Sequence, residues 1–135
     1  MILALLIAAG AAGGDLDSLE KPLCPSINAL VRAAPDDFAS VTKLKLPRGT
    51  KCGVHTGKGP AWYACELHAT SCKGTEKSYA ETKSQLTQCL KSDPREETAG
   101  NKRNARWAVP AKKTMVRLSF VQDSPCLLRL FVENQ

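Results

Sequence analysis

Six cysteines constrain this chain more than any other feature of its sequence: Cys24, Cys52, Cys65, Cys72, Cys89 and Cys126. An even number of cysteines in a small exported chain is typical of a disulfide framework. Six cysteines permit many pairings, and spacing alone does not choose among them. We prefer a Cys65–Cys89 bridge, because it would tie a strand to a helix, and we leave the other pairings open.

The apolar stretch at the start of the chain predicts export. "MILALLIAAGAAGG" has the apolar run and small residues of a secretory signal, and cleavage after Ala11 fits its Ala-Gly-Ala pattern. The run is shorter than the ~20 residues that span a bilayer, which disfavours a membrane anchor. We therefore expect a signal peptide over residues 1–11, a flexible leading segment over 12–22 and one domain over 23–135. The expected location is secreted or periplasmic.

Two segments have the apolar spacing of amphipathic helices. In the first, Leu23, Ile27, Leu30 and Val31 share one helical face, and Pro35 ends the helix. The second covers residues 75–92, with a capping box from Ser78 to Glu81 or a cap one turn earlier at Thr75. Its expected inner stripe is Tyr79, Thr82, Leu86, Cys89 and Leu90.

The remaining segments predict strands and one loop. Residues 41–46 alternate apolar and basic side chains, which indicates a half-buried strand. Residues 51–56 and 61–67 suit a hairpin that places Cys52 roughly opposite Cys65. Residues 92–105 are polar and predict a loop.

The last third has the clearest strand pattern. A short strand surrounds Trp107, and residues 114–122 and 126–134 predict a β-hairpin. In its first strand Val116, Leu118 and Phe120 share one face, while Arg117 lies on the other.

These segments define an α+β fold: a two-layer, disulfide-stapled domain with two helices on an antiparallel sheet of about five strands. The expected order, α-βββ-α-ββ, resembles the helix–three-strand–helix–two-strand arrangement of type III secretion chaperone-like folds. The resemblance is one of topology and implies no function.

The formal net charge of +6 suits an acidic partner or an anionic surface. Basic residues gather in "TKLKLPRGTK" and "NKRNAR" and shortly after the second stretch. Only Trp107 accompanies the second cluster, whereas nucleic-acid grooves interleave several aromatic side chains with basic ones. Nucleic acid is therefore a disfavoured partner. The candidate binding residues are Lys102, Arg103, Arg106, Lys112 and Lys113.

The segment "CELHATSC" (residues 65–72) is the one candidate for site chemistry. A metal site would combine Cys52, His55, Cys65 and His68. Cys52 and His55 are an odd number of positions apart, so on one strand they point to opposite faces. Redox C-x-x-C, G-x-S-x-G and phosphate-loop motifs are absent. We therefore predict no catalytic residue, metal or cofactor.

The sequence favours an exported, non-catalytic binding or accessory protein that recognises another protein. An inhibitor role would suit its small, stapled body. The alternative is a basic protein that binds a polyanion, such as a polysaccharide, or an anionic membrane surface. A weaker alternative is a small hydrolase that uses His55 or His68.

Overall fold

The computed structural model describes residues 23–67, 71–123 and 125–134. The expected signal peptide and leading segment lie outside these residues. In chain order the elements are the first helix (residues 23–33), two 3-10 turns (Ala34–Asp36 and Ala39–Val41), β1 (Gly49–His55), β2 (Trp62–Leu67), α2 (Cys72–Leu90), β3 (Arg95–Ala99), β4 (Lys102–Val109), a third 3-10 turn (Pro110–Lys112), β5 (Thr114–Val121) and β6 (Leu127–Asn134).

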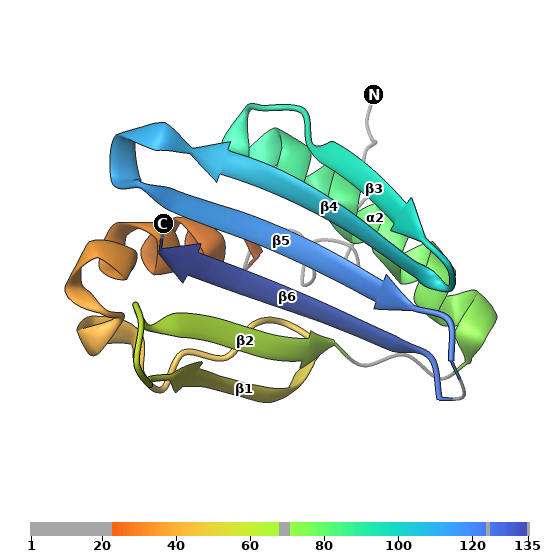
Figure 1. Cartoon of the computed structure of the whole chain (residues 1–135), viewed down its shortest axis with the longest axis horizontal. Helices are drawn as coiled ribbons and strands as arrows, with labels where there is room; N and C mark the ends of the chain where they lie inside the picture. The colour runs from red at the N-terminus through yellow and green to blue at the C-terminus, as the bar shows by residue number, and fades with distance from the viewer. Residues whose placement is uncertain (1–22, 68–70, 124, 135) are drawn as a thin grey trace, which may run out of the picture.

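The strands form one antiparallel sheet in the order β1-β2-β6-β5-β4-β3. Both helices lie on the same side of it, behind the strands in Figure 1. The domain is therefore α+β, two-layered and disulfide-stapled, as the sequence predicts. The described residues form six strands instead of about five, in the order α-ββ-α-ββββ, which differs from the chaperone-like arrangement.

The helices begin and end for local reasons. The first helix buries its expected stripe of Leu23, Ile27, Leu30 and Val31 and ends just before a turn that contains Pro35. In α2, the Ser71 hydroxyl caps the N-terminus by accepting a hydrogen bond from the Gly74 N–H, at 2.9 Å.

The cap of α2 therefore differs from both caps expected from the sequence. Thr75 lies in the first turn of the helix, and its hydroxyl donates a hydrogen bond to the Ser71 carbonyl, at 2.7 Å. Ser78 lies further inside the helix and is buried. The expected inner stripe of the helix is confirmed at Tyr79, Thr82 and Leu86, which are buried.

The expected strand over residues 41–46 is wrong. Phe38 has a left-handed φ of 61° and leads into the 3-10 turn Ala39–Val41, after which the Leu44 N–H bonds to the Val41 carbonyl. Leu46 is buried and Leu44 packs on the core without any strand partner. Alternating apolar residues can thus face a core from a turn as well as from a strand.

The expected loop over residues 92–105 is also wrong, because most of it forms the β3–β4 hairpin. Gly100 and Asn101 make its two-residue turn, and Gly100 has a φ of 60°, where glycine is unstrained. All five residues of β3 are exposed, since β3 is an edge strand. A strand with two wet faces has no apolar alternation to reveal it.

The predicted hairpin of the last third is confirmed as β5 and β6. Val116, Leu118 and Phe120 point to the helices and are fully buried. They form a continuous apolar layer with the helix-facing residues of the other strands, among them Tyr63 and Trp107.

Three disulfides join these elements: Cys24–Cys89, Cys52–Cys65 and Cys72–Cys126. The preferred Cys65–Cys89 bridge is wrong. Cys65 lies directly opposite Cys52 in the β1–β2 register, with 4.0 Å between their Cα atoms. Cys89 instead bonds to Cys24 of the first helix, at a Cα–Cα distance of 5.3 Å.

Gly49 lies against the Cys52–Cys65 disulfide, and a Cβ there would come within 2.5 and 2.6 Å of the two sulfur atoms. We predict that Gly49→Ala lowers the free energy of unfolding by about 1–3 kcal/mol through overpacking. Gly53→Ala is the matched control on the same strand, because a Cβ at Gly53 meets nothing within 4 Å. Urea denaturation of the oxidised protein measures both; equal midpoints would contradict the prediction.

Both tyrosines of the chain are buried between the helices and the sheet, Tyr63 on β2 and Tyr79 on α2. Burial raises the pKa of Tyr63 to about 12, and burial together with the charge of Glu96 raises the pKa of Tyr79 to about 12. A tyrosine phenol in the unfolded chain has a pKa of about 10. Between these two values the unfolded chain loses protons that the folded chain keeps, so the free energy of unfolding falls as the pH rises.

We therefore predict almost no phenolate in the native protein at a pH midway between those values. In urea at the same pH, both tyrosines should be ionised. Ultraviolet absorbance of the phenolate, followed during an alkaline titration, measures this directly. A native titration with its midpoint at the unfolded pKa would show that the two phenols are accessible to water.

Candidate functional site

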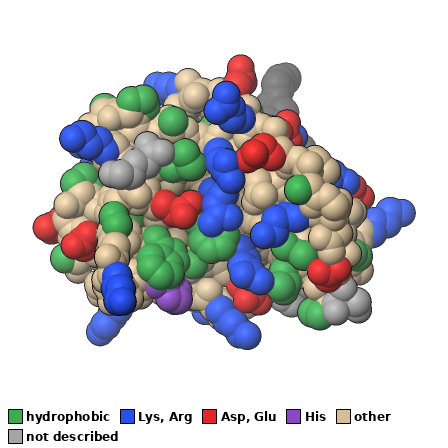
Figure 2. Space-filling view, viewed as in Figure 1, with side chains coloured by type: hydrophobic (Ala, Val, Ile, Leu, Met, Phe, Trp, Pro, Cys, Tyr) green, Lys and Arg blue, Asp and Glu red, His purple; other side chains and the backbone are tan. Residues whose placement is uncertain are grey.

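The face of the sheet opposite the helices, here called the open face, is formed by alternate side chains of all six strands. Figure 2 looks onto this face. A band of basic side chains crosses it, acidic side chains flank the band, and hydrophobic side chains lie beside a histidine at the lower left. The open face is therefore mixed in character and distinct from the apolar face that packs on the helices.

Basic side chains outnumber acidic ones on this face. The register and the alternation of the strands assign the basic side chains to it: Lys51, Arg95, Lys102, Arg106, Arg117 and Arg129. The acidic side chains on it are Glu66, Glu97 and Glu133.

Three arginines stand in a row across three neighbouring strands. Arg95 of β3 is directly opposite Arg106 of β4, which is directly opposite Arg117 of β5. The next residue in the row is Phe131 of β6, and the Arg117 guanidinium carbon lies 4.1 Å from its ring centroid. Like charges directly opposite one another destabilise a sheet by some tenths of a kcal/mol, about 0.2–1. The arginine row (Arg95, Arg106 and Arg117) thus brings electrostatic repulsion into the sheet.

Two glutamates partly offset this repulsion. Arg106 forms an ion pair with Glu97 at 2.6 Å, and Arg117 forms one with Glu133 at 3.0 Å. These pairs are partly exposed to water, which limits the stability they contribute. Within the described residues Arg95 has no ion-pair partner. The row therefore keeps positive charge that its own neighbours do not neutralise.

Other basic side chains of the open face are also unpaired. Lys102 and Arg129 form no ion pair with any residue that the structure describes, although Glu66 lies opposite Arg129. In the row that contains Arg129, Asn104 lies opposite Ser119, and both of these side chains are largely covered. The Asn104 Oδ1 atom is buried and has no hydrogen-bond partner in the described chain.

The other half of the open face, on β6, β2 and β1, carries aromatic side chains and two small residues. Trp62 of β2 stacks on His55 of β1 with 5.2 Å between ring centroids. The row that holds the arginines continues through Phe131 to Ala64 and Gly53. Trp62 and Phe131 are only half-buried, so two large rings are in contact with water.

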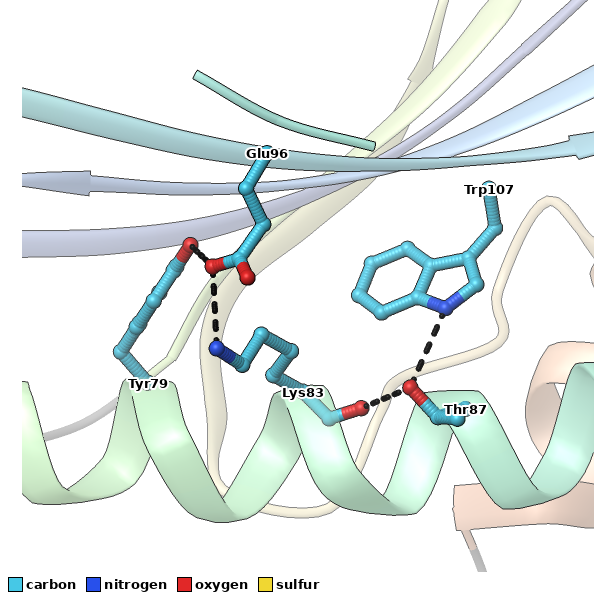
Figure 3. Close-up of polar contacts among 5 residues, drawn as sticks. All are labelled: Tyr79, Lys83, Thr87, Glu96 and Trp107. Carbon is cyan, nitrogen blue, oxygen red and sulfur yellow. Dashed lines mark hydrogen bonds and ion pairs between the residues drawn. The ribbon is translucent and has the colours of Figure 1, made fainter. Parts of the chain in front are cut away.

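Polar contacts with α2 hold β3 and β4 in place (Figure 3). Glu96, on the helix side of β3, accepts hydrogen bonds from Tyr79 at 3.4 Å and from Lys83 at 2.9 Å. On β4 the Trp107 indole N–H donates to the Thr87 hydroxyl at 3.3 Å. These contacts lie on the helix side and leave the open-face side chains of β3 and β4 free of α2.

The structure separates the five binding residues suggested by the sequence. Lys102 and Arg106 lie on the open face, whereas Arg103 points to the helix side and pairs with Glu76 of α2 at 2.8 Å. Lys112 and Lys113 lie at the β4–β5 turn, at the end of the sheet. The five residues therefore do not form one surface.

Three arginines of the open face were not among the predicted binding residues. Arg95 falls in the segment that the sequence predicts as a loop. The sequence predicts strands at Arg117 and Arg129, but their alignment with Arg106 depends on the register between strands. The alternation within each strand predicts which of its side chains share a face. The arginine row is seen only when the register between the strands is known.

The cysteines considered as metal ligands in and near "CELHATSC" form disulfides in the structure. Cys52 and Cys65 are bonded to each other, so neither sulfur is a free thiolate for a metal. Nowhere in the described segments do three or more metal-binding side chains gather. His68 lies outside these segments. Over residues 23–67, 71–123 and 125–134, neither helix combines the length and apolar character that a membrane crossing requires.

No protein-family model, curated protein or solved structure matches this chain.

The cost of the arginine row can be measured with two substitutions on β4. Arg106→Thr removes an exposed ion pair but relieves repulsion from Arg95 and Arg117, so we predict a urea midpoint equal to or above that of the wild type. Arg103→Thr removes the pair with Glu76 and a contact with the Phe120 ring, whose centroid is 5.5 Å away. It should lower the free energy of unfolding by about 0.5–1.5 kcal/mol.

Salt provides the internal check for this comparison. Added salt should stabilise the wild type relative to Arg106→Thr, because it screens the repulsion within the row. If Arg106→Thr is as destabilised as Arg103→Thr, the arginine row stabilises the fold. Its presence would then be explained by stability alone, without a binding role.

Proposed function

We propose that the protein is a non-catalytic binding protein that recognises an acidic surface of another protein through its open face. The observation that carries the proposal is the alignment of Arg95, Arg106 and Arg117 across three strands. Such an alignment opposes folding stability and creates a strip of positive potential on an exposed, rigid face. Carboxylates of a partner would neutralise it with bidentate hydrogen bonds to guanidinium groups.

The mixed character of the open face favours a protein over a polyanion. Glu97 and Glu133 stand within ion-pair distance of the arginines and would repel a uniformly anionic chain. The half-buried Trp62 and Phe131 offer apolar contact area, and arginine and aromatic side chains together are enriched at protein interfaces. A partner with carboxylates and apolar groups side by side would match both properties.

We further propose that the protein acts outside the reducing cytoplasm, as a secreted or periplasmic protein. Three disulfides in a small domain support this location, because such bridges persist mainly in oxidising compartments. The apolar stretch over residues 1–11 supports it from the sequence.

The test compares two doubly substituted proteins with the same change in net charge. Arg106→Gln with Arg117→Gln alters the open face, whereas Lys112→Gln with Lys113→Gln alters the β4–β5 turn. Cross-linking to the wild type in its native compartment identifies the partner protein. We predict that the variant with Lys112→Gln and Lys113→Gln binds this partner as tightly as the wild type does. The same protein should bind the arginine variant at least about tenfold more weakly, the loss expected when two charge-assisted contacts are removed.

The same two variants distinguish the polyanion alternative. Equal weakening by both pairs of substitutions, with binding to an anionic polysaccharide that falls steeply with salt, would mean that total charge governs binding. Retention of the cross-linked protein by the arginine variant would contradict recognition through the open face.

A further inference from the structure

The row that contains the three arginines has a second, uncharged end. Beyond Arg117 it passes through Phe131 to Ala64 and Gly53 at the far side of the sheet. The row thus begins with long cations and ends with an aromatic ring followed by two of the smallest residues. A partner that matched only the cations would leave this uncharged end uncovered.

The small residues leave space above the sheet beside large rings. A Cβ placed on Gly53 would meet no atom within 4 Å. On one side, Trp62 and His55 stand stacked along the neighbouring row. Phe131 stands directly opposite Ala64, with its ring already contacting the Arg117 guanidinium. An apolar side chain resting here would contact aromatic carbon and would displace water from half-buried rings.

We propose that the recognised segment of the partner crosses the strands along this row. In this arrangement its carboxylates lie over Arg95, Arg106 and Arg117, and one bulky apolar side chain lies over Ala64 and Gly53 beside Trp62. The inference rests on the proposed function and specifies the chemistry of the partner: an acidic extended segment with an apolar anchor at one end.

The length of the row sets the length of that segment. Six strands are separated by about 4.8 Å each, so the row is about 24 Å long from β3 to β1. An extended chain rises about 3.3 Å per residue, and a segment of about eight residues therefore covers the row. The acidic residues and the apolar anchor must stand at opposite ends of such a segment, because the arginines and the small residues do.

Synthetic peptides of about eight residues test this directly. Each peptide has a run of glutamates at one end and serines in the middle, and the other end carries either leucine or serine. Both chain directions are made, since the row does not define a direction. Binding is followed by calorimetry and by the fluorescence of Trp62, with the fully buried Trp107 as the unresponsive background.

We predict that the wild type binds the leucine peptide at least about fivefold more tightly than the serine peptide in one chain direction. Gly53→Gln places a polar side chain over Ala64 and should abolish this preference by weakening the leucine peptide to about the affinity of the serine peptide. Gly53→Thr is the second variant, because a β-branched residue suits a strand and the space above Gly53 is open. The urea midpoint of each variant confirms that it folds.

The outcomes separate this inference from the proposed function. Equal binding of both peptides by the wild type, or a leucine preference that persists in both Gly53 variants, overturns the apolar anchor and leaves acidic recognition in place. If Arg106→Gln with Arg117→Gln binds the serine peptide as well as the wild type does, the proposed function fails. If the wild type binds neither peptide, the extended-segment inference is overturned, and the cross-linked protein with the Arg106→Gln and Arg117→Gln variant still decides the proposed function.

Discussion

Burial of the helix-facing side chains sets the register of the sheet, and the register creates the open face. Trp107, Val116 and Val132 lie opposite one another on β4, β5 and β6 and are fully buried. A slip of one residue in any of these strands would exchange its two faces and bring arginine side chains against the helices. Burying such charges without partners would cost several kcal/mol, about 3–5. The apolar layer therefore holds Arg106 and Arg117 in line, even though their charges repel.

The helix layer makes this arrangement rigid. Disulfides fasten both ends of α2: Cys72 binds Cys126 before β6, and Cys89 binds Cys24 of the first helix. Between these ends, hydrogen bonds from Lys83 and Tyr79 reach Glu96 of the edge strand β3. The exposed β3 is thus attached to the core although it has no buried residue. A strand backbone fixed in this way limits the conformational freedom lost on binding to that of the arginine side chains, which favours affinity.

The sequence predicts the parts of this structure that follow from apolar periodicity. Leu23, Ile27 and Leu30 mark the first helix, and alternation marks the β5–β6 hairpin. Polar β3 escaped prediction because an edge strand with two wet faces has no alternation, although Gly100-Asn101 is a recognisable two-residue turn. The arginine row could not be predicted from clusters in the sequence, because its members lie on three strands and meet only through pairing. Clustering instead pointed to Arg103, Lys112 and Lys113, which face elsewhere.

The central claim is that the open face is the binding surface, and nuclear magnetic resonance tests it most directly. The protein would be labelled with nitrogen-15 and titrated with the purified partner that cross-linking identifies. The signals of backbone amides and arginine Nε–H groups would be followed. We predict that the largest shifts occur at the Nε–H groups of Arg106 and Arg117 and at the Trp62 indole. The exposed side of α2 should stay unchanged. Shifts confined to α2 or to the Lys112–Lys113 turn would contradict the claim and place the binding surface elsewhere.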